Sequence, residues 1–261
     1  MQMIDIHCHI LPQIDDGAKT LEDSIFMVKK AIIDGIDTII ATPHSQDGLF
    51  SPDINDVINK TLELNNINKS HNLNINIIPG MEVHLCKNIF EKIKSKQVLT
   101  LNDSNYLLLE LPGQHMPDFI FEEIFQLRLN GITPIIAHPE RNMVIIKDWT
   151  LLYGFVEKGV LIQITSGSIS GKFGHEIFKC SKKIIKNRLA HIIASDAHNS
   201  ESRPPVLLEA FTIAKKILGS DKEAYEMVYE RPKKIINNKT IEIPDPFKKR
   251  KKNFFKNFVR R

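Results

Sequence analysis

The chain has 261 residues, 42% hydrophobic and 25% charged, and no segment reaches the roughly 18 apolar residues of a membrane helix, which excludes an integral membrane protein. The formal net charge of +4 is uneven, because the last fourteen residues contain eight Lys or Arg and no acid. The remainder therefore carries about −4, which argues against a nucleic-acid-binding protein that spreads positive charge over one face.

Seven short segments rich in apolar and β-branched residues recur along the chain, and each predicts a strand. They cover residues 3–7, 36–42, 75–79, 106–111, 133–138, 160–165 and 191–195. Amphipathic stretches with a helical pattern separate them. Thr20 and Asp23 have the spacing of a capping box, and Ser51 would cap a helix that begins at Pro52.

The alternation of strands and helices predicts the fold class. Successive βα units with strongly apolar strands form a parallel sheet that helices cover. Closing that sheet into a ring gives an α/β barrel, which we expect as one domain over residues 1–246, followed by a basic tail over 247–261. In such barrels the catalytic groups lie at the C-terminal ends of the strands.

Six of the seven predicted strands end in side chains that can bind a metal ion. In chain order these are His7 and His9, His44, Glu82, Glu110, His138, and Asp196 with His198. Residues i and i+2 of a strand face the same way, so His7 and His9 can reach one ion while Cys8 points to the opposite side. Imidazole and carboxylate groups without converging thiolates favour zinc, iron or manganese acting as a Lewis acid. A single His-x-His would be weak support, but so many unpaired polar groups on one rim would be costly to bury without a metal.

The remaining histidines do not follow this pattern. His71, His84 and His175 are expected at the surface. For His84, the phase relative to Glu82 predicts a different face of the strand. His191 begins an apolar strand and is expected to be a hydrogen-bonded core residue. His115, in the segment LPGQHMP, could contact a substrate.

Several of these motifs together resemble a known family. The segments IDIHCHILPQIDDGAKTLEDS, IIATPH, PGMEV, LLLEL, IIAHPERN and ASDAHN occur in the order typical of the PHP (polymerase and histidinol phosphatase) superfamily. More closely, they resemble its manganese-dependent bacterial protein-tyrosine phosphatases, which occur with capsule and exopolysaccharide machinery. The resemblance covers most of the chain, from about Met3 to Arg203.

The resemblance implies a distorted seven-stranded α/β barrel of the PHP type with two or three metal ions at the C-terminal ends of its strands. Mn²⁺ is the implied metal, and iron or zinc are possible. The implied ligands are His7, His9, Asp16, His44, Glu82, Glu110, His138, Asp196 and His198. The choice of Asp16 over Asp15 follows from the family's motif, since the sequence alone does not separate the two.

The implied reaction is hydrolysis of a phosphate monoester, in which metal ions neutralise the phosphoryl oxygens and supply hydroxide near neutral pH. Arg141 and Arg203 follow two of the ligand strands and could bind the phosphoryl oxygens; the alternative for each is an ordinary surface ion pair. A cysteine-based phosphatase needs Arg six positions after its Cys. The residues six positions after Cys8, Cys86 and Cys180 are Ile14, Lys92 and Lys186, so none of the three cysteines fits that mechanism.

Three other functions remain open. The same metal rim would hydrolyse histidinol phosphate or another small phosphomonoester, although the DDGA, ATPH and HPERN segments favour the tyrosine-phosphatase branch. A non-enzymatic regulator that only docks on the polysaccharide-assembly kinase is a rival of another class. An exonuclease is disfavoured because the body lacks a basic track.

The resemblance also implies the substrate, which is expected to be a phosphotyrosine protein, namely the autophosphorylated, membrane-associated tyrosine kinase that regulates capsule synthesis. A cytoplasmic location is expected, because no secretory signal is apparent and three widely spaced cysteines do not suggest disulfides. In the tail, Lys248 to Lys252 form a basic run, followed by Phe254, Phe255, Phe258 and Val259 at helical spacing. Such an end can bind an anionic membrane or a partner, and the alternative is a solvated terminus.

Overall fold

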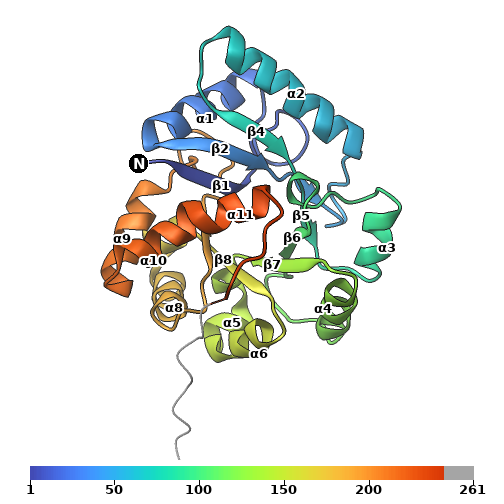
Figure 1. The fold of residues 1–261 in the computed structure, drawn as a ribbon, viewed down its shortest axis with the longest axis vertical. Coiled ribbons are helices and arrows are strands. Elements are labelled where there is room, and N and C mark those ends of the chain that lie inside the picture. The colour runs from blue at the N-terminus through green and yellow to red at the C-terminus, as the bar shows by residue number, and fades with distance from the viewer. Residues whose placement is uncertain (244–261) are drawn as a thin grey trace, which may run out of the picture.

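The structure is a computed structural model that describes residues 1–243 and consists of parallel strands surrounded by helices (Figure 1). The strands are β1 (Met3–Cys8), β2 (Ile36–Ala41), β3 (His44–Ser45), β4 (Asn76–Pro79), β5 (Glu82–His84), β6 (Tyr106–Glu110), β7 (Thr133–Ala137), β8 (Leu161–Thr165) and β9 (Ile192–Ala194). The helices are α1 (Leu21–Asp34), α2 (Ile54–Ser70), α3 (Ile89–Lys94), α4 (Ile120–Leu129), α5 (Met143–Lys147), α6 (Leu152–Glu157), α7 (Ser166–Ile169), α8 (His175–Lys186), α9 (Leu208–Leu218), α10 (Asp221–Tyr225) and α11 (Arg231–Ile236). Short 3₁₀ turns are η1 (Leu101–Asp103), η2 (Pro139–Arg141) and η3 (Trp149–Leu151), and η4 (Glu226–Glu230) is a π-helical turn.

The strands form two parallel sheets, in the orders β1-β2-β4 and β3-β5-β6-β7-β8-β9. All seven predicted strands are present, but the count of seven is wrong, because the short strands β3 and β5 follow β2 and β4 as separate elements. The two sheets approach each other where β1 meets β9, through a bridge between Cys8 and Ala197 and the bond from the Asp196 amide to the His7 carbonyl at 2.8 Å. The parallel α/β architecture is confirmed, whereas closure into one continuous barrel is not.

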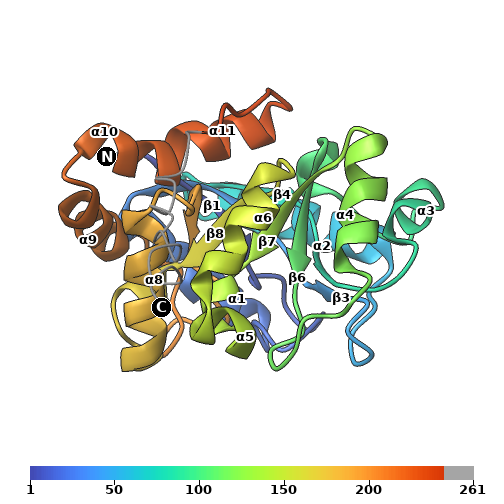
Figure 2. The same cartoon turned by 90° about the horizontal axis from the view of Figure 1, so that it is seen from below.

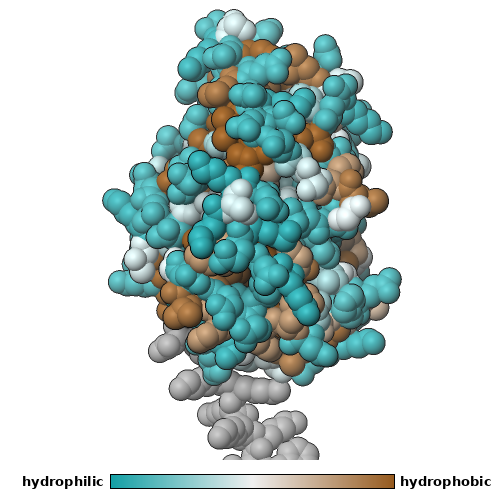
Figure 3. All heavy atoms as spheres, turned by 90° about the vertical axis from the view of Figure 1, so that its right-hand side faces the viewer, coloured by the Kyte–Doolittle hydropathy of each residue, from teal (hydrophilic) through white to brown (hydrophobic). Residues whose placement is uncertain are grey.

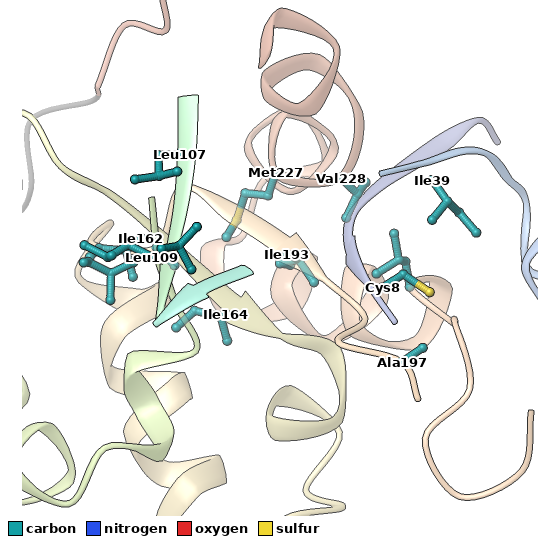
Figure 4. Close-up of a cluster of buried hydrophobic side chains, with 14 of the residues drawn as sticks. Cys8, Ile39, Leu107, Leu109, Ile162, Ile164, Ile193, Ala197, Met227 and Val228 are labelled. Carbon is teal, nitrogen blue, oxygen red and sulfur yellow. The ribbon is translucent and has the colours of Figure 1, made fainter. Parts of the chain in front are cut away.

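Alternation along the strands divides the interior into two apolar clusters. In β6, Leu107 and Leu109 pack outward against the helices, and in β9 Ile193 does the same (Figure 4). Tyr106 and Leu108 of β6 belong instead to an inner cluster that the strands enclose. This period of two follows from the pleat of a strand, and burial on both faces explains why these strands are apolar almost throughout.

The outward side of β1 includes Cys8, which is fully buried beside Ala197, as predicted from its phase (Figure 4). Helices α10 and α11 lie across one side of the strands (Figures 1 and 2). Ile235 of α11 joins the inner cluster with Ile4 and Ile192, so this helix covers the end at which the strands begin. The opposite end, where the strands finish, is left for polar side chains.

Of the two predicted helix starts, the one at Thr20 is confirmed and the one at Ser51 is wrong. Thr20 caps α1, and its side chain and that of Asp23 form the reciprocal capping box that their spacing predicts. The prediction that Ser51 and Pro52 start the next helix is wrong. Asp53 is the N-cap of α2, because its carboxylate accepts the Asn55 amide at 2.7 Å.

Within residues 1–243, no helix is long and apolar enough to cross a membrane. On the side shown in Figure 3, hydrophilic side chains cover most of the surface and separate the apolar ones. The predicted boundary at residue 246 and the basic tail of residues 247–261 lie outside the described residues.

Candidate metal centre

The nine predicted ligands converge at the ends of strands from both sheets. They form four overlapping groups, in each of which the ligand atoms lie within 4.8 Å of one another. The groups are His9, Asp16, His44 and His198; His7, His9 and Glu82; His7, His138 and Asp196; and His44, Glu82 and Glu110. Among the described residues, no other side chain belongs to these groups. His7, His9, His44 and Glu82 each belong to two of them, so the groups form one continuous cluster.

Glu82, the first residue of β5, lies at the middle of this cluster and is fully buried. Its Oε2 atom lies 3.2 Å from His7 Nε2, 3.3 Å from His9 Nε2 and 3.1 Å from His44 Nδ1. Its Oε1 atom lies 2.9 Å from His138 Nε2. Oε2 and His44 Nδ1 are buried, yet neither makes a hydrogen bond of acceptable geometry within the described part of the chain.

This packing of lone pairs is what a cation site requires. The Nε2 atoms of His7 and His9 face each other at 3.2 Å, and a neutral imidazole has one lone pair and one N–H to offer. A buried arrangement with so few matched donors is costly unless positive charge lies between the groups. The donor set, imidazole nitrogens and carboxylate oxygens, therefore fits zinc, iron or manganese.

Local backbone strain helps to aim two of the side chains. His138, directly after β7, has φ 30°, and Asp196, two residues after the end of β9, has φ 51°, so both adopt the left-handed region. Such conformations cost free energy for residues other than glycine and persist where surrounding contacts impose them. The hydrogen bond that the Asp196 amide donates to the His7 carbonyl, at 2.8 Å, is one such contact.

A second layer of polar residues orients the imidazoles. Gln163 Oε1 lies 2.9 Å from His7 Nδ1, and Asp15 Oδ2 lies 2.7 Å from His9 Nδ1. Each contact directs the opposite ring nitrogen, Nε2, into the cluster. Asp5 is fully buried and accepts hydrogen bonds from the amide and the hydroxyl of Ser195, at 2.9 and 2.5 Å.

Sequence reasoning assigned no role to Gln163, Asp5 or Ser195. The available signal was a polar residue inside an otherwise apolar strand, as Gln163 is in β8 and Asp5 is in β1. Asp15 and Asp16 do separate in the structure. Asp16 Oδ1 lies 3.3 Å from His198 Nε2 and 3.6 Å from His44 Nε2, on the cluster side.

The electrostatics favour ionised carboxylates at the centre. Burial opposes ionisation of Glu82 and is the largest single influence on it, but His7, His138 and His9 lower its pKa well below the usual range. Asp196 behaves in the same way, with burial outweighed by His7, His9, His138 and Arg203, so that its pKa is also well below the usual value. Both carboxylates are thus available as anionic ligands.

Both predicted phosphate-binding arginines point to Asp196. Arg141 Nη1 lies 2.5 Å and Arg203 Nη2 2.8 Å from Asp196 Oδ2. The carboxylate is buried, while the two guanidinium side chains keep about a third of their surface exposed, at 35% and 27%. These are therefore not ordinary surface ion pairs. A small cavity of about 110 Å³, lined by Glu110, His138 and Arg141 among others, opens beside them.

The other histidines were mostly placed correctly. His71 caps the end of α2 and His175 begins α8, both at the surface, and His191 is fully buried with its Nδ1 accepting the Ile162 amide at 2.9 Å. The prediction for His84 is wrong. His84 lies two residues after Glu82 in β5, which puts both on the same side, and its Nδ1 is 3.1 Å from Glu110 Oε2. His115 is exposed and stays a possible substrate contact.

Comparisons with known proteins agree along nearly the whole chain. A family model described as "Capsular polysaccharide synthesis, CpsB/CapC" matches residues 3–237. Tyrosine-protein phosphatase YwqE of Bacillus subtilis is 40% identical over 95% of this chain and 98% of its own. The putative tyrosine-protein phosphatase CapC of Staphylococcus aureus is 39% identical over 97% and 99% of the two chains.

Solved structures also match this chain along nearly its whole length. A chain from the crystal structures of YwqE from Bacillus subtilis and CpsB from Streptococcus pneumoniae, described as unique metal-dependent tyrosine phosphatases, superposes with a TM-score of 0.89 at 38% identity. The match covers 95% of this chain and all of the other. An amidohydrolase from Mycoplasma synoviae matches with a TM-score of 0.57 at 16% identity over 90% and 87% of the chains, which is a likeness of fold alone.

Proposed function

This chain belongs to the CpsB/CapC family of capsular polysaccharide synthesis proteins, and we propose that it is a metal-dependent phosphatase that hydrolyses phosphotyrosine in proteins. The observation that carries the proposal is the cluster of nine His, Asp and Glu side chains, in a chain about 40% identical to a tyrosine-protein phosphatase. A cluster of this composition supports metal-assisted hydrolysis, and the relatives supply the substrate class.

Two or three ions would occupy the four groups of ligands, because the groups overlap at His7, His9, His44 and Glu82 and an imidazole nitrogen has only one lone pair for one ion. Mn²⁺ is the metal we propose, with iron and zinc as alternatives for the same donor set. When bound, the ions supply charge neutralisation for the phosphoryl oxygens and lower the pKa of a coordinated water.

The chain's own contribution is to bind and orient the phosphoryl group. Arg141 and Arg203 reach the cluster from the segments after β7 and β9, and both are held by Asp196. Their remaining N–H groups can donate to phosphoryl oxygens, and they would stabilise charge as it develops there. We propose both as catalytic residues. His115 is exposed, and its backbone carbonyl accepts the Asn142 Nδ2–H at 3.1 Å. It would lie near the protein that carries the phosphotyrosine.

The finer features of the fold and location are also proposals. We propose that the two sheets act as one distorted barrel, since the end of β1 is hydrogen-bonded to Asp196 and Ala197 in the segment that follows β9. A cytoplasmic location is supported by Cys8, Cys86 and Cys180, which are all free. The substrate we propose is the autophosphorylated tyrosine kinase of capsule synthesis, which lies at the membrane.

For the basic tail we propose contact with an anionic membrane surface, where each basic residue contributes about 1 kcal/mol. Truncation after Pro246 should leave hydrolysis of a small soluble phosphate ester unchanged, because every proposed ligand precedes residue 199. Full-length protein should sediment with vesicles that contain phosphatidylserine at low salt, and the truncated protein should not. Equal binding of the two forms would remove the membrane role.

One experiment tests the function itself. Chelated protein is supplied separately with Mn²⁺, Zn²⁺ or Mg²⁺ and assayed on a phosphotyrosine peptide, a phosphoserine peptide and histidinol phosphate. We expect hydrolysis of the phosphotyrosine peptide only with metal, and most with Mn²⁺. Preference for histidinol phosphate would establish the small-molecule phosphatase instead. Metal binding without hydrolysis of any of the three would favour a non-enzymatic regulator of the kinase.

A further inference from the structure

The aromatic ring of Phe173 contacts both arginines of the proposed phosphate site. Phe173 lies between α7 and α8, and its ring centroid is 5.3 Å from Arg141 Cζ and 5.9 Å from Arg203 Cζ. The three residues follow three different strands, β7, β8 and β9, so the ring joins side chains from separate loops. No sequence pattern pointed to Phe173, because its partners are distant in the chain.

The two guanidinium groups need such a partner because one carboxylate oxygen serves both. Arg141 Nη1 donates to Asp196 Oδ2. Arg203 Nη2 donates to the Asp196 backbone carbonyl at 3.0 Å and lies 2.8 Å from the same carboxylate oxygen, so two positive charges face one negative charge. The face of an aromatic ring attracts a cation without using any of its N–H donors. The donors that do not reach Asp196 stay available for another acceptor. Arg203 Nε is buried and has no hydrogen-bond partner among the described residues, as expected of a donor that an oxyanion would complete.

The position of the Phe173 ring is set from the other side by α7. A Cβ atom added to Gly167 would lie 2.9 Å from Phe173 Cε2 and 3.0 Å from Cζ, so the ring packs directly on the glycine backbone. The Lys172 amide donates to the Gly167 carbonyl at 2.9 Å, which ties the loop to the same helix. The ring is therefore fixed by the scaffold independently of the two arginines.

We propose that Phe173 is a positioning residue, whose ring holds the guanidinium planes of Arg141 and Arg203 in the orientation that receives a phosphoryl group. This inference rests on the proposed function, in which these arginines bind phosphate. Among the ring contacts of the described residues, Phe173 meets these two arginines and no proposed metal ligand. Its loss should therefore weaken phosphate binding without releasing metal.

The test uses the full-length, Mn²⁺-loaded protein with two changes at Phe173, one at Gly167 and one distant control. Phe173→Leu removes the π face and keeps apolar bulk, whereas Phe173→Tyr restores the face. Gly167→Ala displaces the ring without altering it. Phe121→Leu is the control, because Phe121 carries a comparable contact with Lys158 Nζ, 5.5 Å from its centroid, on another part of the surface.

Binding of inorganic phosphate is measured by calorimetry, together with kcat and KM on a phosphotyrosine peptide, metal content and the unfolding temperature. Phe173→Leu and Gly167→Ala should weaken phosphate binding and raise KM by about tenfold at unchanged metal content, a size expected for a partly desolvated cation–π pair. Phe173→Tyr should restore both values, and Phe121→Leu should change neither.

Wild-type phosphate affinity in stable Phe173→Leu and Gly167→Ala proteins would overturn the inference while leaving the phosphatase proposal intact. An equal loss in the Phe121→Leu control would overturn it as well, since the effect would not be local. If the wild-type protein bound phosphate but hydrolysed no phosphotyrosine, the proposed function would fail, and the calorimetric comparison would still decide the role of Phe173.

Discussion

The Asp15 carboxylate accepts the Nδ1–H of His9 at 2.7 Å, which leaves His9 Nε2 as the lone pair that faces Glu82 and Asp196. The same carboxylate accepts the amides of Gly17 and His44, each at 3.0 Å. Burial opposes its ionisation, but His9 and these two amides lower the Asp15 pKa below its usual value. Asp15 is therefore an anion whose oxygens are already used.

Asp15→Asn should weaken metal binding by roughly 10- to 100-fold, the range typical for the loss of a partner that orients a ligating histidine. The amide that replaces one oxygen can donate to His9 Nδ1 and so place the imidazole proton on Nε2, where it blocks a metal. Titration of chelated protein with Mn²⁺ measures the affinity. Glu63→Gln, an exposed change of the same kind on α2, is the control. Equal affinities for Asp15→Asn and the control would contradict the role.

The second prediction separates ligands from phosphate-binding residues. His7→Ala should lose metal and activity together, because His7 belongs to two of the ligand groups. Arg141→Ala and Arg203→Ala should keep their metal and lose turnover by about 10²-fold each, the scale of one charge-stabilising donor. Elemental analysis beside steady-state kinetics distinguishes the two classes. An arginine variant with wild-type kcat/KM would remove that residue from the mechanism.

The third prediction concerns the cysteines, which should be dispensable for activity. Burial raises the pKa of each thiol, that of Cys180 to about 12, and this is the opposite of what a nucleophilic thiolate requires. The combined variant Cys8→Ala, Cys86→Ser and Cys180→Ala should retain most of its kcat on a phosphotyrosine peptide. Loss of activity in a folded triple variant with normal metal content would count against a purely metal-based reaction.

Much of the site followed from the sequence because it lies at strand ends. Six of the seven apolar segments, such as residues 133–138, end at or close to a His, Asp or Glu, and parallel strands bring such ends together. The period of two also assigned Cys8 correctly to the outer side of β1. The pattern could not show that Asp15 orients His9 while Asp16 faces the cluster, because two adjacent carboxylates are equivalent in the sequence until the loop is folded.

The orientation of His84 was missed because it depends on where the chain begins a new strand. The chain interrupts pairing at Gly80 and begins β5 at Glu82, so a single strand ending near Pro79 gave the wrong face for His84. Gln163 and Phe173 act on residues that lie far away in sequence and close in space, as with the 2.9 Å contact between Gln163 and His7. Local periodicity contains no information on such pairs.

The last prediction uses His191, the fully buried histidine immediately before β9, which belongs to none of the four groups of candidate ligands. Burial, assisted by the positive charge of Arg231, lowers its pKa from 6.5 to about 3. The unfolded chain therefore binds a proton between these pH values that the folded chain does not bind. Stability consequently falls as the pH decreases from 6.5 towards 3, by at most about 1.4 kcal/mol per pH unit from this residue.

His191→Asn should remove this part of the pH dependence, because the Asn carbonyl can accept the Ile162 amide that His191 Nδ1 accepts at 2.9 Å and does not titrate. Denaturant unfolding at several pH values from 4 to 7 gives, for each protein, the slope of the free energy of unfolding against pH. Chelator is present so that protons released by metal binding do not contribute to this slope. The variant should be less stable at pH 7 and should lose less stability on acidification. His175→Asn, at an exposed position, should keep the wild-type slope. If His191→Asn kept it too, the buried histidine would be protonated in the folded protein or paired in a way that its surroundings do not indicate.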